Sequence, residues 1–318
     1  MGFLIFLGAL AIAVLGLGLW GTNFACRRHS EPNWADPEEM KKTGREQFIP
    51  DIHAAIAWLE RNRKEDWYRV SKDGLKLHAH WCPVEGAKGT LILFHGYRSS
   101  YYLDFSKILH QYHRMGYHLL VVDQRSHGLS EGKYITFGVR ESEDAILWIH
   151  AVNSRCGEDH PVFLDGLSMG STTVLMALGR GVTPNVRGCI ADCGFTSPWD
   201  EIGHCIRRWY HVPPTPVLWI MYPFFKLIAG FGLKEYSTVE ALKNNRVPLL
   251  MLHGLGDNFV PSWMSQRAFD ANPGEKNLIL VEGADHGLSY VTDEARCQSA
   301  LEEFLNQYNS VSVKEAEQ

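Results

Sequence analysis

The chain begins with a long apolar stretch that differs from everything after it. Residues 3–20 are apolar or glycine without interruption, and the first charged side chain is Arg27. Roughly 20 such residues span the hydrocarbon core of a bilayer, whereas a helix inside a soluble domain normally keeps a polar face. The pattern predicts a transmembrane anchor over residues 1–25. A cleaved signal peptide is the alternative, but it would open with Lys or Arg, and neither precedes the apolar stretch.

A polar segment separates this anchor from the rest of the chain. Residues 31–46 are polar and contain Pro32 and Pro37, which indicates a linker. Residues 48–63 then show apolar side chains at helical spacing, which predicts an amphipathic helix packed against the next domain. Linker and helix together occupy residues 26–65. The apolar positions of the helix are Ile49, Ile52, Ala55, Ile56 and Leu59.

Two short strand patterns follow, at residues 67–70 and 75–81. The intervening Asp-Gly pair is typical of a tight hairpin turn. His78 and His80 share one face of the second strand because side chains alternate along a strand. Two histidines without a third ligand more often lie on a surface strand than bind a metal, so no metal site is predicted.

Buried strands alternate with helices after residue 86. Helix patterns at about 103–115 and 140–153 lie between continuous apolar runs, as expected for parallel strands covered on both faces. This alternation predicts an α/β fold with a mostly parallel, doubly wound sheet, to which the N-terminal hairpin adds an antiparallel edge. We expect the domain to span residues 66–310, with a tail at 311–318. The apolar runs are 90–94, 118–122, 161–164, 186–191, 247–252 and 277–281.

Composition excludes some classes of partner. The 318 residues include 31 Lys and Arg against 36 Asp and Glu, a formal net charge of −5, so the basic excess that nucleic-acid binding needs is missing. The seven cysteines are scattered, without the paired Cys and His spacing that holds zinc. We expect them to be buried or idle thiols in a reducing compartment, and we expect no metal or organic cofactor.

A Gly-x-Ser-x-Gly motif supplies the first candidate for chemistry. Gly166 to Gly170 follow an apolar run and precede a helix-favouring segment, which is the strand, turn and helix context of a nucleophile elbow. In so sharp a turn a Cβ on either glycine would collide with the neighbouring strand or helix. Ser168 is therefore the candidate nucleophile, with its hydroxyl projecting above the sheet.

A base and an acid lie in suitable places further along the chain. Asp257 and His286 each follow an apolar run, so both lie at the C-terminal end of a strand, where ligands meet such sheets. The order Ser168, Asp257, His286 is that of an α/β-hydrolase triad. Asp192, which ends an earlier strand, is an alternative acid. Asp285 adjoins the histidine, but a role in stabilising its loop is expected instead.

Stabilising an oxyanion requires two donors beside the nucleophile. The backbone N–H of Met169 is one candidate, and the N–H of Tyr97, after the first parallel strand, is the other. The Tyr97 phenol could add a hydrogen bond or form a wall of the pocket, and both options stay open. His95 is expected to be a structural hydrogen-bonding residue.

Residues 198–246 interrupt the alternation of strands and helices. The segment is too long for a simple crossover and is rich in aromatic and aliphatic side chains around three prolines. Such insertions are commonly lids or binding loops, so a helical cap over the catalytic face is predicted. Most of its aromatic side chains are expected to pack the cap onto the sheet, and two or three to line a pocket.

Five motifs in this order resemble the α/β-hydrolase superfamily. More narrowly, the chain is similar to bacterial membrane-anchored hydrolases grouped with serine aminopeptidases and monoacylglycerol-lipase-like enzymes. The resemblance covers about residues 67–308 and is specific for the fold and the triad, but not for the substrate. The motifs are His95-Gly96-Tyr97, Asp123 to Ser130, Gly166 to Gly170, Gly256-Asp257 and Asp285-His286-Gly287.

In that family the Asp-x-Arg-x-His-Gly-x-Ser loop is structural, which implies no catalytic role for Asp123, Arg125 or His127. The chain departs from the family pattern at three positions, none of which removes a catalytic atom. They are Ser126 and Ser171, where glycine is more usual, and Leu167, where many relatives have histidine.

The sequence therefore predicts a serine hydrolase, esterase-like or lipase-like, that acts on a small acyl ester or lipid-like substrate. A serine peptidase is the enzymatic alternative, and it would need a carboxylate in the cap to bind the substrate amine. Glu201, Glu235 and Glu240 are the options. A membrane-tethered binding protein with the same fold is the non-catalytic alternative. Basic residues near the anchor favour a single-pass protein with a cytoplasmic catalytic domain.

Overall fold

The computed structural model of the chain describes all residues except 30–32, 43–44 and 310–318. The predicted tail at 311–318 and the Pro32 end of the predicted linker lie outside the described residues. The described part of the chain forms an eight-stranded sheet in the order β1-β2-β4-β3-β5-β6-β7-β8. Neighbouring strands are parallel, except that β2 runs antiparallel to both β1 and β4. The strands are β1 Glu65–Val70, β2 Lys76–Cys82, β3 Gly89–Phe94, β4 Tyr117–Asp123, β5 Val162–Leu167, β6 Val186–Asp192, β7 Leu249–Gly254 and β8 Lys276–Val281.

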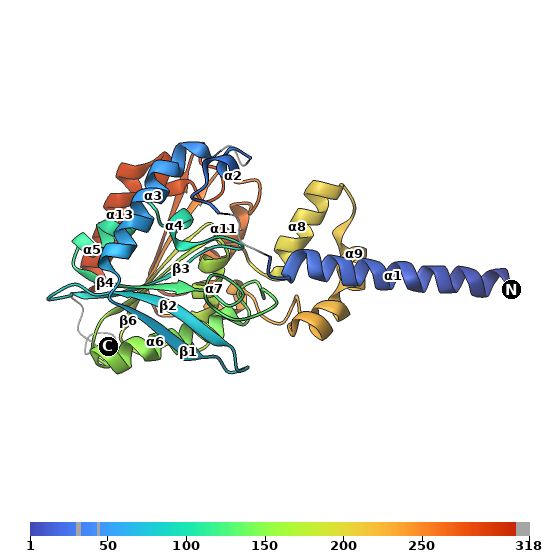
Figure 1. The fold of residues 1–318 in the computed structure, drawn as a ribbon, viewed down its shortest axis with the longest axis horizontal. Helices are drawn as coiled ribbons and strands as arrows, with labels where there is room; N and C mark the ends of the chain where they lie inside the picture. The colour runs from blue at the N-terminus through green and yellow to red at the C-terminus, as the bar shows by residue number, and fades with distance from the viewer. Residues whose placement is uncertain (30–32, 43–44, 310–318) are drawn as a thin grey trace.

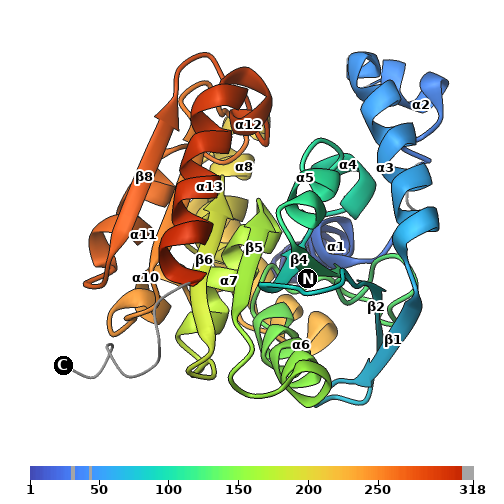
Figure 2. The ribbon, with the colours of Figure 1, turned by 90° about the vertical axis from the view of Figure 1, so that its left-hand side faces the viewer.

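Helices cover both faces of this sheet (Figure 2). One face packs against the buried side chains of α6, α7, α10 and α11, and the other against those of α3, α5 and α13. The central strands are mostly apolar because helices cover both faces. The predicted fold class, a mostly parallel doubly wound sheet with an antiparallel edge, is confirmed. These helices are α3 Ile49–Asn62, α5 Leu109–Arg114, α6 Glu141–Cys156, α7 Met169–Leu178, α10 Thr238–Leu242, α11 Trp263–Ala271 and α13 Glu294–Asn309.

The order of the strands reverses at β3. The chain passes from β3 to β4 on one side and then returns to place β5 on the other side of β3. Loops that leave β3 and β5 therefore diverge at their carboxyl ends, and such a switch point is where α/β sheets bind ligands. The segment after Phe94 and the turn at Ser168 lie at this point.

The helix predicted at 103–115 is interrupted. The structure has α4 (Tyr101–Asp104) and α5 (Leu109–Arg114), separated by a turn. The break lets Asp104 turn inward, where its carboxylate accepts the Gly96 amide at 2.6 Å, while α5 still buries Leu109 and Tyr112 in the core. This tertiary contact overrides the helical spacing.

Segment 198–246 forms helices at one edge of the sheet. They are α8 (Pro198–Tyr210), α9 (Pro214–Phe224), a π-helical turn (Phe225–Ala229) and α10. Each of α8 and α9 has a proline at its first turn, where the missing N–H costs nothing. We call the part from α8 to the π-helical turn the cap.

The N-terminal apolar stretch forms one helix, α1 (Gly2–Cys26), which projects from the body beside the cap (Figure 1). Its C-terminal half packs on α9, where Gly18 and Gly21 leave no room for a Cβ against Phe224 and Met221. Just beyond the helix, Arg27 forms a β-bridge with Tyr134. The end of the apolar helix is therefore part of the folded body.

The predicted linker is partly structured. It contains a short helix, α2 (Pro37–Lys41), capped by the Asp36 side chain, and a 3-10 turn at Glu46–Phe48. The helix α3 matches the amphipathic helix expected at 48–63, and its buried side chains are Ile52, Ala55 and Leu59.

His78 and His80 share a face of β2, but the expectation that they lie on the surface is wrong. Both are buried, because β1 and α4 cover that part of the sheet. His78 Nδ1 lies 2.7 Å from Asp123, and His80 Nδ1 lies 2.8 Å from Asp66. Carboxylate partners make the burial of these imidazoles possible.

Candidate active site

Ser168 lies in a strained turn between β5 and α7. Its backbone has φ 58° and ψ −116°, a conformation that costs a non-glycine residue energy and persists only where the surroundings hold it. Here the Ser168 amide donates to the Asp192 carbonyl at 2.8 Å, and the Ser168 carbonyl accepts from the Thr172 amide at 3.0 Å. The turn thus fixes the serine at the carboxyl edge of the sheet.

The two glycines of the motif are required by close packing. A Cβ on Gly166 would lie 2.3 Å from the Gly170 backbone, and a Cβ on Gly170 would lie 1.8 Å from the Phe94 carbonyl oxygen. Backbone atoms cannot give way by such amounts. The collision expected from the sequence is present at both positions.

The structure brings Ser168, His286 and Asp257 together. His286 Nε2 lies 2.9 Å from Ser168 Oγ, and His286 Nδ1 lies 2.6 Å from Asp257 Oδ2. The three residues follow β5, β8 and β7, whose carboxyl ends share one edge. An ionised carboxylate at Nδ1 makes that nitrogen the proton donor and leaves Nε2 to accept the serine proton.

Asp257 is held by more than the imidazole. Its other oxygen, Oδ1, accepts the amides of Phe259 and Val260 at 2.9 and 2.8 Å, and His253 Nε2 lies 3.3 Å from Oδ2. Burial opposes ionisation of Asp257, but the hydrogen bonds with His253 and His286 outweigh it and hold the pKa of this carboxyl well below its usual range. The carboxylate therefore stays charged and oriented.

The two alternative acids have other partners. Asp192 is buried, which raises the pKa of its carboxyl, and it accepts the Ser289 hydroxyl at 3.0 Å. Asp285 Oδ1 accepts the backbone amide of His286 at 2.8 Å. Asp192 and Asp285 thus bond to groups other than the His286 imidazole, so Asp257 is the acid that the geometry favours.

Both candidate oxyanion donors border the serine. Met169 is the first residue of α7, so its amide has no carbonyl partner one turn earlier. The loop that carries Tyr97 lies close to the serine, because a Cβ on Gly96 would be 3.3 Å from Ser168 Cβ. The Tyr97 phenol donates to the carbonyl of Ala25 in α1 at 2.7 Å. The phenol therefore uses its proton in a bond to α1, and Tyr97 lines both cavities that border Ser168.

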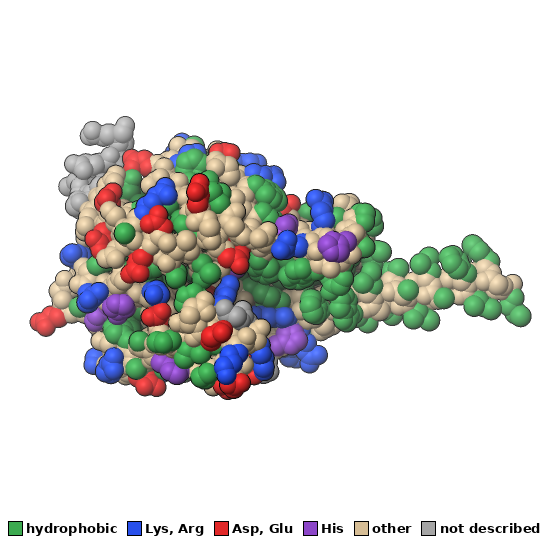
Figure 3. All heavy atoms as spheres, turned by 90° about the horizontal axis from the view of Figure 1, so that it is seen from above, with side chains coloured by type: hydrophobic (Ala, Val, Ile, Leu, Met, Phe, Trp, Pro, Cys, Tyr) green, Lys and Arg blue, Asp and Glu red, His purple; other side chains and the backbone are tan. Residues whose placement is uncertain are grey.

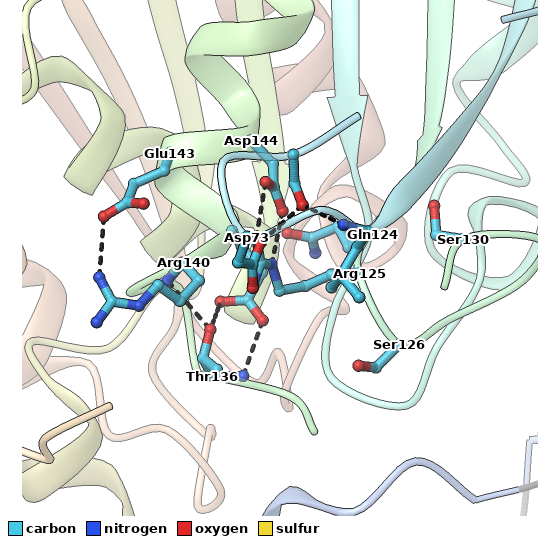
Figure 4. Close-up of polar contacts among 12 residues, drawn as sticks. Asp73, Gln124, Arg125, Ser126, Ser130, Thr136, Arg140, Glu143 and Asp144 are labelled. Atoms are coloured by element: carbon cyan, nitrogen blue, oxygen red, sulfur yellow. Dashed lines mark hydrogen bonds and ion pairs between the residues drawn. The ribbon is translucent and has the colours of Figure 1, made fainter. Parts of the chain in front are cut away.

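The loop after β4 supports this arrangement through contacts of its side chains with other elements (Figure 4). Arg125 is buried, and its guanidinium contacts Asp144 of α6 at 2.7 Å and Asp73 of the hairpin turn at 2.9 Å. His127 Nε2 accepts the Arg98 amide at 3.0 Å, which fixes the residue next to Tyr97. These contacts are structural, as the family resemblance implies.

Two details of neighbouring residues agree with that resemblance. Ser126 has a φ of 65°, in the left-handed region where glycine is more usual. His95 is buried, its Nδ1 lies 2.8 Å from the Gly96 carbonyl, and its Nε2 accepts the Gln124 amide at 3.2 Å. His95 thus has the structural role expected of it.

Two cavities meet at Ser168. The first, of about 490 Å³, is bounded by the linker and by the loops around α4 and α12 (Ser289–Thr292), and its walls include the charged side chains Arg45, Asp104 and Lys107. The second, of about 360 Å³, lies between α1 and the cap and has almost wholly apolar walls. We call them the linker cavity and the cap cavity. A reacting ester could place its two halves in two different environments.

One of the three carboxylates considered in residues 198–246 borders this site. Glu201 lines the cap cavity, and burial raises the pKa of its carboxyl to about 8. Its Oε2 has no hydrogen-bond partner among the described residues. Glu235 is paired instead with Arg140 at 2.8 Å, and Glu240 is exposed in the first turn of α10.

Potential metal ligands cluster at three places in the described part of the chain. In each, three ligand atoms lie within 4.8 Å of one another. One cluster contains Asp257 and His286, which already bond to each other, and another is the Asp66 group, whose carboxylate contacts both neighbouring imidazoles. The absence of a metal or cofactor stays a prediction. The clusters are His118, Cys156 and His160; Asp66, His78 and His80; and Cys193, Asp257 and His286.

Some contacts of the site could not be found from the sequence. Arg45 donates to the His286 carbonyl at 3.3 Å across 241 residues of chain, and the Tyr97 contact with Ala25 spans 72 residues. Neither belongs to a motif or a periodic pattern, so no local signal marks it. His253, the second partner of Asp257, looks in the sequence like one more residue of an apolar strand.

Comparison with known proteins agrees with this fold. The sequence profile of the serine aminopeptidase family S33 matches residues 85–230. The esterase Pf2001 of Pyrococcus furiosus superposes with a TM-score of 0.63 at 22% identity, over 80% of this chain and 95% of that one. The chain therefore has the α/β-hydrolase fold, and its central part is similar to the serine aminopeptidase family.

The chain is similar from end to end to the protein YqkD of Bacillus subtilis. The two are 24% identical over 306 residues, which cover 96% of this chain and 97% of that protein. The lysophosphatidylserine lipase ABHD12 of Danio rerio is 24% identical over 260 residues, or 79% of this chain and 60% of the lipase.

Proposed function

We propose that the protein is a serine hydrolase that cleaves carboxylic esters with Ser168 as nucleophile, His286 as base and Asp257 as the orienting acid. The observation that carries the proposal is the position of the imidazole, 2.9 Å from the serine oxygen and 2.6 Å from the carboxylate. Similarity to an esterase structure and to a lipase sequence supports the reaction class.

The reaction follows from these positions. His286 Nε2 takes the Ser168 proton as Oγ attacks the ester carbonyl, and the amides of Tyr97 and Met169 donate to the oxyanion. The imidazolium then protonates the leaving alcohol, and an acyl-enzyme remains. Water, deprotonated by the same imidazole, attacks the acyl group, and the acid leaves as Ser168 regains its proton.

A fluorophosphonate probe and an ester panel test the proposal. We expect the parent protein to be labelled at Ser168 and to hydrolyse p-nitrophenyl esters. Ser168→Ala should abolish labelling, and His286→Ala should lower kcat by about 10⁴ or more, because the serine loses its base. An unlabelled parent protein with no turnover, but with an intact fold by circular dichroism, would favour the non-catalytic binding protein instead.

A serine peptidase is the second candidate, and Glu201 is the observation that favours it. The Glu201 Oε2 atom, which has no partner among the described residues, could accept a hydrogen bond from a substrate amine, as the serine aminopeptidase profile suggests. Its raised pKa of about 8 means that the carboxyl is neutral at pH 7 and becomes a carboxylate above pH 8.

Aminoacyl anilides test this candidate. If Glu201 binds the substrate amine, anilide cleavage should rise as the pH passes 8, and Glu201→Gln should remove both the rise and most of the activity. If the protein is an esterase, Glu201→Gln should leave ester hydrolysis within about twofold of the parent, since an amide fills the same volume.

Helix α1 is proposed to be an uncleaved membrane anchor. It has 25 residues and a mean hydropathy of 2.5, properties that a signal sequence can share. Its C-terminal end, however, is bonded to the catalytic body through the Tyr97 and Arg98 side chains. Basic residues after the helix support a cytoplasmic position of the body, by the positive-inside rule. The seven cysteines, all free, agree with that compartment.

A further inference from the structure

The cap cavity has one wall made by the N-terminal helix. The α1 side chains that line it follow a single helical face, with a spacing of three, one, three and one residues. The opposite wall comes from α8 and α9, and Ser168 contributes to the lining. The α1 residues are Leu17, Trp20, Gly21, Phe24 and Ala25.

This wall is fixed in place near the nucleophile. Besides the Tyr97 contact with Ala25, Arg98 donates to the Phe24 carbonyl at 2.6 Å, and the Ile135 amide donates to the Cys26 carbonyl at 2.7 Å. The last turns of α1 are thus held by hydrogen bonds from the loop that carries a proposed oxyanion donor. A substitution near the end of α1 can therefore alter the position of the loop that carries Tyr97.

The outer end of the cavity lies beside lipid if α1 spans a bilayer. Residues 1–13 are exposed, and they are about 20 Å long at 1.5 Å per residue. A hydrocarbon core is about 30 Å thick, so the bilayer must also surround the part of α1 that packs on the cap. The cap exposes Trp209, Tyr210 and Trp219 there, and such aromatic side chains favour the interface. Figure 3 shows hydrophobic side chains along α1 and on the adjoining body.

We propose that the cap cavity is the binding channel for a long acyl chain of a membrane lipid ester, that α1 forms one of its walls, and that the chain enters from the bilayer. This inference rests on the proposed esterase function and names the substrate class. The acyl carbonyl lies at Ser168, the hydrocarbon chain lies along the apolar face of α1, and the polar alcohol part occupies the linker cavity with its charged side chains. The N-terminal helix is then a specificity element as well as an anchor.

Substitutions at two depths of the channel test the proposal in the full-length protein in detergent micelles. Ala25 lies near the nucleophile, and Leu17 lies about 12 Å further out along the helix. Leu17→Trp should lower kcat/KM for p-nitrophenyl palmitate by at least about tenfold and spare the octanoate and butyrate. Ala25→Phe should lower kcat/KM for both the octanoate and the palmitate ester. Leu19→Trp is the matched control, because Leu19 is exposed and off the lining face, and its chain-length profile should equal the parent's.

Several outcomes would overturn the channel while leaving the esterase intact. One such outcome is that the ratio of palmitate to butyrate hydrolysis stays unchanged in both Leu17→Trp and Ala25→Phe. Another is that this ratio shifts as much in Leu19→Trp as in Leu17→Trp. If Leu17→Trp also loses butyrate hydrolysis, binding is measured instead, by the fluorescence of parinaric acid, a fatty acid, added to the Ser168→Ala protein. The proposal requires that adding Leu17→Trp weakens this binding and that adding Leu19→Trp does not. No Ser168-dependent hydrolysis of any ester by the parent would overturn the proposed function itself.

Discussion

At the scale of single residues, two buried aspartates at strand ends have different surroundings. Asp257 has one oxygen fixed by two backbone amides and the other at the imidazole. Asp192 is turned toward the Ser289 hydroxyl. Both positions look alike in the sequence, because each follows an apolar run. The difference arises from the direction in which each loop leaves its strand.

Amide substitutions should separate these two residues. Asp257→Asn keeps the shape but offers the wrong hydrogen-bonding group to His286 Nδ1, so kcat for ester hydrolysis should fall by about 10⁴. Asp192→Asn should change kcat by no more than a few-fold, since its partner is a hydroxyl that can also bond an amide. Steady-state kinetics on p-nitrophenyl butyrate measures both. Loss of activity in the second variant alone would transfer the acid role to Asp192.

At the scale of elements, the loop after β4 ties together parts of the fold that are remote in sequence. Arg125 contacts Asp73 of the hairpin turn and Asp144 of helix α6, and so links these two elements. Figure 4 shows the arginine reaching both carboxylates. His127 from the same loop holds the Arg98 amide beside the site. The sequence motif of this loop indicates a structural role. Its partners Asp73 and Asp144 are brought to it only by the packing of the hairpin and helix α6.

Breaking this buried pair should destabilise the protein. Arg125→Met leaves the Asp144 carboxylate buried without its main cation, which costs about 3–5 kcal/mol. Denaturant unfolding followed by circular dichroism measures the loss. The double variant Arg125→Met with Asp144→Leu should recover most of it, because the buried Asp144 carboxylate is then removed together with its cation. Equal stability of the parent and the single variant would contradict the role of the pair.

At the scale of the whole molecule, the anchor and the catalytic body form one structure. Helix α1 packs on α9, lines the cap cavity and ends in hydrogen bonds to the loop that carries Tyr97. A flexible tether would make none of these contacts. Helix α1, the cap and Ser168 therefore have a fixed relation to one another.

Fractionation should show this relation in cells. In an expressing bacterium we expect the protein to stay with membranes through high-salt and alkaline washes, because burial of the apolar helix, rather than charge, retains it. Detergent should release it. Protease added outside intact spheroplasts should leave the catalytic body whole, and lysis should expose it. Recovery in the soluble fraction, with the N-terminal residues removed, would indicate a cleaved signal sequence.

Local patterns in the sequence determined the strands, the hairpin, the elbow and the order of Ser168, Asp257 and His286. They do so because glycine positions, apolar runs and strand ends constrain the backbone within a few residues. The tertiary structure alone decided the break between α4 and α5, the burial of His78 and His80, and the docking of α1 beside the nucleophile. Each depends on a partner outside the element itself, such as Gly96 for Asp104, Asp123 for His78 or Tyr97 for Ala25. The periodicity of the sequence predicts which face of an element is apolar, but not which other element packs against that face.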